Sequence, residues 1–197
     1  MARDEAGTPA RDETFRKELA VLIPHLRAFA RTLCGDPAAA DDLAQDAMLK
    51  AWAARESFEL GTNMKAWTFM ILRNQFYSER RRSWRQSQLD QEAAERTLVA
   101  IDDPSAPLAL DELRQGLAML PAEQREALIL VGAGGFAYEE AALICDCAVG
   151  TVKSRVSRAR RALQGILESG AYQRDGREAK DAMSSILAAA ERLSQAR

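Results

Sequence analysis

The amino-acid sequence predicts an all-α protein of two small helical domains, joined by a flexible linker and followed by a C-terminal helix. Three observations lead to this prediction. The chain has 197 residues, which is enough for two small domains, and only 6% of them are aromatic. Apolar residues recur three or four positions apart in several segments, whereas no segment shows the alternation of a strand. An acidic, proline-containing stretch separates the two helical blocks.

The first block begins with a helix expected over residues 14–33. Its broad apolar face consists of Phe15, Leu19, Leu22, Ile23, Leu26, Phe29, Ala30 and Leu33. Asp36 and Pro37 then predict the start of a second helix, because Asp is a good N-cap and Pro is tolerated in the first turn. This helix should end near Ala54 and bury Leu43, Ala44, Ala47, Met48, Ala51 and Trp52.

A loop over residues 56–63 precedes a third helix, which is expected from Met64 to about Trp84. Its predicted interior side carries Ala66, Trp67, Met70, Ile71 and Asn74. From Arg73 to Arg85 there are five Arg and one Glu, so this end of the helix has a net charge of +4. Trp84 is expected either to stack on a base or to cap the domain.

The predicted linker, residues 86–107, begins an acidic stretch that extends to Glu112. Residues 86–112 hold seven acidic residues and one Arg, a net charge of −6, and the prolines prevent a continuous helix. The sequence therefore predicts a domain over residues 14–85, this linker, a second domain over residues 108–169, and a tail over residues 170–197. The tail contains an amphipathic segment that predicts a helix.

Three helices are expected in the second domain. One runs from Pro121 to Val131, and a short one covers Tyr138 to Ile144. The turn Cys145 to Ala148 leads directly into a basic helix that begins near Val149. A helix, a tight turn and a basic helix form the helix-turn-helix pattern, whose second helix enters the major groove of DNA.

The basic helix divides into an apolar and a cationic side. Its buried stripe is formed by Val149, Val152, Val156, Ala159, Leu163 and Ile166. Its polar side carries Thr151, Lys153, Ser154, Arg155, Arg158, Arg160 and Arg161. Such a helix suits base and phosphate contacts in the major groove, although a solvated basic face and a helix on an anionic membrane are alternatives.

Other functional classes find little support in the sequence. The net charge is −2, so the chain is no general polycation. There is no apolar run long enough to cross a membrane and no signal-peptide core, which predicts a cytoplasmic protein without membrane insertion. The three cysteines lack a CxxC pair and His25 is the only histidine, so no metal site or cofactor is expected. No catalytic motif is present, and we expect a protein that is not an enzyme.

Several phrases, in order along the chain, resemble the extracytoplasmic-function (ECF) sigma factors, which are initiation subunits of bacterial RNA polymerase. They are ADDLAQDAMLKAW at 40–52, NMKAWTFMILRN at 63–74, LPAEQREAL at 120–128, and GTVKSRVSRARR from residue 150. Further phrases are similar to the EcfG-like subgroup of the general stress response: LIPHLRAFAR at 22–31, FELGTNMKAW at 58–67 and CDCAVGTVKSR at 145–155.

This resemblance implies a sigma2-like helical bundle, a sigma4-like helix-turn-helix domain and three kinds of contact. The basic helix should read the −35 element as duplex. Recognition and melting of the −10 element would use Asn63, Lys65, Asn74, Tyr77, Arg80 and Arg81. The clamp helices of the β′ subunit would be held by Asp41, Asp42, Gln45, Asp46 and Lys50, and the β flap is a further expected partner. For the acidic face of the second helix, a solvated surface and a metal site are the alternatives.

The resemblance also implies how the protein is regulated. An anti-sigma factor of the NepR type would hold the chain inactive, and a response regulator of the PhyR type would release it. The acidic linker would either serve solubility or thread along a basic channel of the polymerase. Two other functions compete with initiation: a sigma-like decoy that only binds an anti-sigma factor, and a helix-turn-helix repressor that acts without polymerase.

Overall fold

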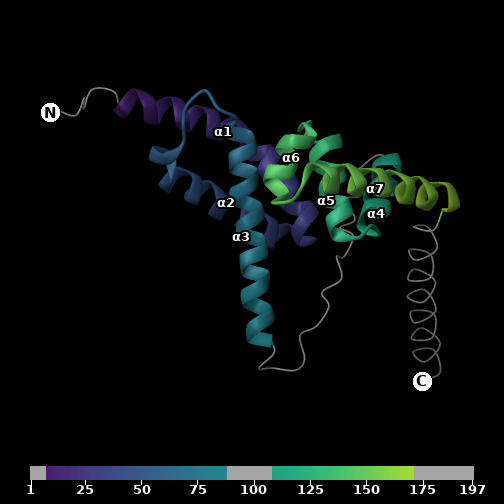
Figure 1. Ribbon diagram of the computed structural model, residues 1–197. Coiled ribbons are helices and arrows are strands. Elements are labelled where there is room, and N and C mark those ends of the chain that lie inside the picture. The colour runs from purple at the N-terminus through teal and green to yellow at the C-terminus, as the bar shows by residue number, and fades with distance from the viewer. Residues whose placement is uncertain (1–7, 88–107, 171–197) are drawn as a thin grey trace, which may run out of the picture.

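A computed structural model describes residues 8–87 and 108–170, and within these ranges it contains helices and no strand (Figure 1). The predicted all-α fold is therefore confirmed. The helices are α1 (Thr8–Cys34), α2 (Pro37–Ala53), the 3₁₀ helix η1 (Arg55–Ser57), α3 (Met64–Ser87), α4 (Leu108–Ala118), α5 (Ala122–Gly132), α6 (Tyr138–Cys145) and α7 (Val149–Ser169). We refer to α1–α3 as the first module and to α4–α7 as the second module; the two pack side by side.

In the first module, α1 and α2 pack against each other and against one side of α3. The predicted apolar face of α1 is buried, with only Ile23 partly exposed. Phe15 lies in an aromatic cluster, with its ring centroid 6.0 Å from that of Trp52, 5.8 Å from Phe58 and 6.1 Å from Trp67. Trp67 was expected to be a packing residue, and this contact confirms it.

The first helix starts earlier than the sequence indicates. It begins at Thr8, whereas the apolar periodicity supported a start near residue 14. The extra turns are held by tertiary contacts: Arg11 donates to the carbonyl of Phe58 at 2.6 Å, and Asp12 pairs with Arg55 at 3.1 Å. Polar contacts of this kind do not contribute to hydrophobic periodicity, so the sequence pattern did not predict the earlier start of α1.

The start of α2 agrees with the prediction. Asp36 is the N-cap, and its carboxylate accepts a hydrogen bond from the backbone N–H of Ala39 at 2.7 Å. Pro37 opens the first turn, where its missing N–H costs no hydrogen bond. The buried residues of α2 lie on the predicted face, and Met48 and Trp52 are partly buried beside it.

The predicted interior side of α3 is only partly correct: Ala66, Trp67 and Ile71 pack against the core without being its buried residues. The buried residues are Met64, Thr68, Phe69, Leu72 and Gln75. Four of the predicted five, Ala66, Trp67, Met70 and Ile71, are only partly buried, and Asn74 is exposed. The physical reason is that α3 is covered on more than one side, by α1 and α2 and also by α6 of the second module. A helix enclosed in this way has no single apolar stripe.

The second module is arranged around the helix-turn-helix pair. Pro121 is the N-cap residue of α5, one position outside the helix that was predicted to include it. Arg125 is buried and donates to the carbonyl of Ala118, the last residue of α4, and to that of Leu120 in the following turn. The sequence did not reveal this structural role. In the turn after α6, Asp146 adopts the left-handed conformation, with φ 50°. In the predicted stripe of α7, Val152, Val156 and Ala159 are fully buried, whereas Val149, Leu163 and Ile166 are partly buried.

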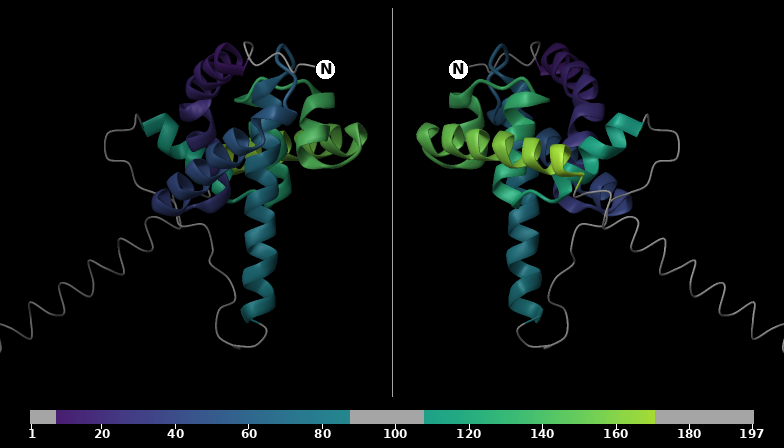
Figure 2. Two further views of the ribbon diagram at one scale, coloured as in Figure 1. Left: turned by 90° about the vertical axis from the view of Figure 1, so that its left-hand side faces the viewer. Right: turned by 90° about the vertical axis from the view of Figure 1, so that its right-hand side faces the viewer.

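The loop between α5 and α6 requires a glycine. A Cβ atom at Gly134 would lie 2.5 Å from the backbone oxygen of Leu130 and 2.9 Å from the ring of Phe136. The missing side chain therefore lets Phe136 fold back into the core, where it is buried. This loop lies against α3, as Figure 2 shows from two further sides, and it positions the contact between the modules.

Two predicted segments lie outside the described residues. They are most of the linker, residues 88–107, and the C-terminal tail from residue 171. Within the described ranges, no helix combines the length and apolar character needed to span a bilayer.

Three acidic groups, the buried Cys145 and the partly buried Cys34 and Tyr77, predict a loss of stability at alkaline pH. Burial, with help from nearby carboxylates, raises the pKa of Cys145 from 9.0 to about 12 and that of Cys34 to about 11. Burial and Glu126 raise the pKa of Tyr77 from 10.0 to about 12. At a pH between the ordinary pKa of such a group and its raised pKa in the folded chain, the unfolded chain releases the proton while the folded chain keeps it. The free energy of unfolding therefore falls as pH rises.

Urea denaturation at about pH 8 and about pH 10.5 measures this effect, with a slope of at most about 1.4 kcal/mol per pH unit for each group. In the variant Cys145→Ala, the free energy of unfolding should fall less steeply with pH, because the contribution of Cys145 is absent. A free energy of unfolding that stays constant over this interval would contradict the prediction.

Candidate nucleic-acid interface

The cationic side of α7 faces away from the core of the second module. Lys153, Ser154, Arg158, Arg160 and Arg161 are exposed. Their contacts are short-range: Arg158 donates to the Oγ of Ser154 at 3.2 Å, and Arg161 donates to the Oγ of Ser157 at 3.4 Å. Lys153 lies over the ring of Tyr138, with 5.7 Å from Nζ to the centroid. The helix therefore presents a row of cations on a backbone that is fixed by its buried stripe.

Two members of the predicted set, Thr151 and Arg155, are partly buried. Arg155 is 17% exposed; it forms an ion pair with Glu123 of α5 and donates to the Sγ of Cys147 at 3.7 Å. Glu123 itself is 66% exposed, so water screens this pair. In the folded chain, Arg155 is therefore held by α5 and by the turn before α7, which the sequence did not indicate.

The six residues predicted to contact the −10 element, five on α3 and one just before it, fall into two groups. Asn74, Arg80 and Arg81 are exposed. By contrast, Asn63, Lys65 and Tyr77 contact the second module. Asn63 donates to a carboxylate oxygen of Glu140, and Lys65 donates to the carbonyl of Gly134 at 2.7 Å. Tyr77 donates from its hydroxyl to Glu126 at 3.3 Å.

The contact between the modules continues from these residues into a buried ion pair. Arg73 of α3 donates to Glu126 of α5 at 2.7 Å, where Arg73 is 14% and Glu126 1% exposed. Burial raises the pKa of Glu126, and the neighbouring guanidinium of Arg73 opposes that shift. Beside the pair, the rings of Phe69 and Phe136 meet edge to face, with 5.0 Å between centroids.

The predicted acidic face of α2 is exposed except at one position. Asp42, Gln45, Asp46 and Lys50 are open to solvent. Asp41 is partly buried and accepts two hydrogen bonds from Arg27 of α1, which hold the pKa of its carboxyl below the usual value. The sequence analysis missed the apolar member of this face: Leu49 is 67% exposed on the same helix.

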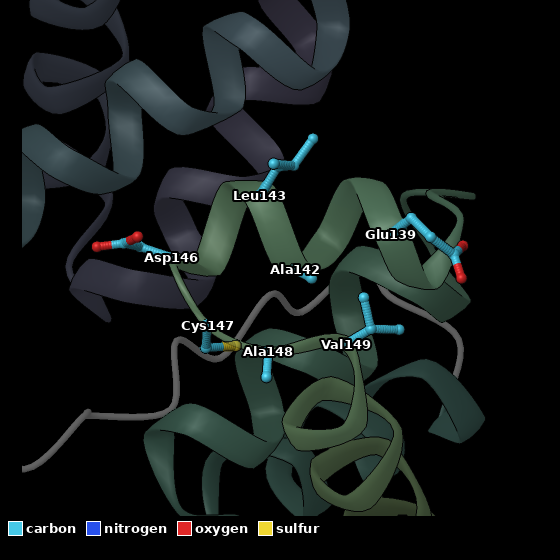
Figure 3. A pocket seen from close by; sticks show the side chains of 7 residues that line it. All are labelled: Glu139, Ala142, Leu143, Asp146, Cys147, Ala148 and Val149. Carbon is cyan, nitrogen blue, oxygen red and sulfur yellow. The ribbon is translucent and has the colours of Figure 1, made fainter.

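A shallow hollow lies where α6 turns into α7 (Figure 3). It has a volume of about 510 Å³ and is lined by Glu139, Ala142, Leu143, Asp146, Cys147, Ala148 and Val149. Leu143 is 73% exposed, and Figure 3 shows its side chain projecting from α6. Any group that enters the hollow would therefore lie next to the first turn of the cationic helix.

Two family models match the chain. The model "Sigma-70 region 2" covers residues 21–86, and the model "Sigma-70, region 4" covers residues 110–163. The first range includes α2 and nearly all of α3, and the second includes α5, α6 and most of α7. The exposed polar residues of α2 and α3 thus fall within the first matched segment, and the cationic side of α7 falls within the second.

Comparison with individual proteins agrees with these matches. The ECF RNA polymerase sigma factor EcfG of Rhodopseudomonas palustris is 47% identical over 155 residues, which cover 79% of this chain and 86% of that protein. The ECF RNA polymerase sigma-E factor of Escherichia coli K12 is 35% identical, over 64% of this chain and 73% of its own length. Among solved structures, the sigma factor RpoE of Bartonella quintana, crystallised with the anti-sigma factor NepR, is 48% identical with a TM-score of 0.72; the match covers 79% of this chain and 98% of that one.

Proposed function

Because the chain belongs to the ECF RNA polymerase sigma factors, we propose that it directs core polymerase to stress-response promoters, recognises and melts them, and so starts transcription. The observation that best supports this function is the match to two sigma-70 regions, at residues 21–86 and 110–163. Each region contains a helix with exposed cationic residues, α3 in the first and α7 in the second. A sigma factor regulates transcription, and the chemistry of RNA synthesis then belongs to the core enzyme. The proposed domain boundaries, from the sequence, are residues 14–85 and 108–169.

The −35 element is assigned to α7. Its first turns carry Lys153, Ser154 and Arg155, where base edges are reached in a helix-turn-helix complex. Arg155 is proposed to read a guanine through both of its terminal nitrogens, once it has left Glu123. The exposed Arg158, Arg160 and Arg161, together with Thr151 near the N-terminus of the helix, orient the duplex through phosphate contacts.

The −10 element is assigned to α3 and the turn before it. Asn63, Lys65, Asn74 and Tyr77 offer polar and aromatic groups to bases that are exposed by melting. Arg80 and Arg81 supply cations to the backbone, supported by their exposure near the end of α3.

The exposed face of α2 is proposed as the contact with the β′ clamp helices. It offers Asp42, Gln45, Asp46 and Lys50, and Leu49 adds an apolar centre to this polar surface. Asp41 contributes by holding α2 to α1 through Arg27. The β flap is the proposed partner of the second module.

An anti-sigma factor of the NepR type is proposed as the inhibitor of this chain, with a PhyR-type response regulator releasing it. The 48% identity to a sigma factor crystallised with NepR supports this partner. The match covers 98% of that protein, so nearly all of the sigma factor crystallised with NepR has a counterpart in this chain. The proposed location is the cytoplasm, where the polymerase works.

Run-off transcription tests the proposed function. Purified core polymerase is combined with this chain on a template carrying a stress promoter, and specific transcripts are expected only when the chain is present. Addition of a NepR-type protein should abolish them. If no template yields transcripts while the chain still binds the inhibitor, the chain is a decoy and not an initiation factor.

Releasing Arg155 from its ion pair should tighten binding to the −35 duplex. An exposed ion pair is worth about 0.2–1 kcal/mol, so Glu123→Gln should raise the affinity by up to about fivefold. Fluorescence anisotropy at fixed salt measures the change. Glu168→Gln, which makes the same change at the far end of α7, is the control; an equal gain in both variants would mean that only net charge matters.

A further inference from the structure

One buried polar side chain links α2 to α3. Gln75 of α3 is 4% exposed, and its Nε2 donates to the Oδ2 of Asp46 on α2 at 2.9 Å. The same nitrogen donates to the Oε1 of Glu79, one turn farther along α3, at 3.0 Å. A carboxamide NH₂ group has two donors, so the single side chain of Gln75 holds both carboxylates at once.

The two carboxylates that Gln75 holds lie on the outer surface. Asp46 and Glu79 are both exposed, and Asp46 belongs to the face of α2 that is proposed to contact the β′ clamp helices. An exposed side chain samples several rotamers, and fixing it when a partner binds costs conformational entropy. The hydrogen bond from Gln75 restricts the carboxylate of Asp46 before any partner arrives.

The amide of Gln75 orients these carboxylates without neutralising them. Among the ion pairs within the described residues, none involves Asp46 or Glu79. Asp41, earlier on the same helix, differs because it forms an ion pair with Arg27 of α1. The charge of Asp41 is therefore already engaged, whereas Asp46 offers its charge to a cation of a partner.

The burial of Gln75 brings a cost that an apolar residue would avoid. Its Oε1 is buried and has no hydrogen-bond partner among the residues that the structure describes. A buried acceptor without a partner raises the free energy of the folded state. Leu72 and Phe69, three and six positions earlier on α3, are buried and apolar. The hydrogen bonds that the amide donates explain a glutamine at this position better than core packing does.

We propose that Gln75 is a positioning residue for polymerase binding: its amide fixes the carboxylate of Asp46 in the orientation in which α2 presents it to the clamp helices. This inference rests on the proposed function, which assigns Asp46 to that contact. Gln75 is itself buried, so it acts only through the carboxylates that it holds. Glu79, held by the same nitrogen, extends the oriented anionic surface from α2 onto α3.

The test replaces Gln75 by an apolar side chain of similar length. Gln75→Met removes both hydrogen bonds and leaves every charge of the chain unchanged. Gln164→Met is the matched control, because Gln164 donates to Glu168 at 2.7 Å with the same four-residue spacing, but on α7. Circular dichroism and urea denaturation verify that each variant is folded, and Gln75→Leu takes the place of Gln75→Met if the latter is not.

Binding of the labelled full chain to purified core polymerase is measured at several salt concentrations. Gln75→Met should weaken binding about three- to tenfold, because the side chain of Asp46 must then be ordered during association. Gln164→Met should bind like wild type. The salt dependence of binding should be the same for Gln75→Met as for wild type, since no charge has been removed.

A double-mutant cycle determines whether Gln75 acts through Asp46. Asp46→Ala alone should weaken binding and lower its salt dependence, because it removes a charge from the contact. Adding Gln75→Met to Asp46→Ala should change the affinity by less than about twofold. If Gln75 acted through the fold as a whole, Gln75→Met would weaken binding equally in both backgrounds.

Each outcome decides the proposal. If Gln75→Met binds core polymerase as tightly as wild type, or if its loss persists in the Asp46→Ala background, the positioning role is overturned. If neither apolar variant folds, Gln75 is a structural residue and the positioning role is likewise overturned. If wild type itself does not bind core polymerase, the proposed function fails, and the role of Gln75 fails with it.

Discussion

The variant Phe15→Ala is expected to lose about 3–5 kcal/mol of unfolding free energy, because it removes a fully buried aromatic ring and leaves a cavity. Phe15 is 1% exposed, and three other aromatic rings surround it. Two of these rings, Trp52 and Trp67, lie on α2 and α3, so the cavity would open where the three helices of the first module meet. A domain has only about 5–15 kcal/mol of stability in total, so this loss is large.

Urea denaturation followed by circular dichroism measures the loss. Val21→Ala on the same helix is the control: Val21 is 69% exposed, and its change should stay within about 0.5 kcal/mol. The Phe15→Ala protein should also lose run-off transcription at elevated temperature, since α2 and α3 carry the proposed polymerase and −10 surfaces. A loss below about 1 kcal/mol would show that the aromatic cluster tolerates the cavity.

Arg155→Ala is expected to weaken binding of the cognate −35 duplex by about 1–3 kcal/mol and to change binding of a scrambled duplex much less. Arg155 lies between the buried Val152 and Val156, which fix the backbone from which its guanidinium reaches the groove. Loss of a base contact lowers affinity only where the right base is present, and therefore relaxes specificity.

Arg161→Ala is the matched comparison, because Arg161 is exposed two turns farther along α7 and is assigned to phosphate. It should weaken both duplexes alike and lower the salt dependence of binding by about one unit. Fluorescence anisotropy with both duplexes at several salt concentrations measures the difference. Equal losses on cognate and scrambled DNA for Arg155→Ala would overturn the distinction between the two arginines.

Local signals in the sequence predicted much of the fold. The Asp36 N-cap and the α7 stripe were correct because both depend on residues within one or two turns. The buried side of α3 was predicted only in part, because a helix covered by two modules does not show one apolar face. The contact between Arg73 and Glu126 joins residues 53 positions apart, and nothing local in the sequence identifies such a pair.

The same limit applies to the candidate site. The exposed cations of α7 could be predicted, because a helix with a buried stripe leaves its other side to solvent. The engagement of Arg155 by Glu123, and of Lys65 by the carbonyl of Gly134, depends on tertiary packing. Sequence reasoning therefore identified the chemical groups but not which of them are already occupied in the folded chain.

The last turns of α3 run past the ends of the helices beside them (Figures 1 and 2), and residues 79–85 are exposed. A stretch of this kind depends on its own hydrogen bonds and residue propensities more than on the core. Warming should therefore fray it well before the body melts. Because Arg80 and Arg81 are proposed to hold the DNA backbone, we expect this hold to weaken gradually with temperature rather than abruptly.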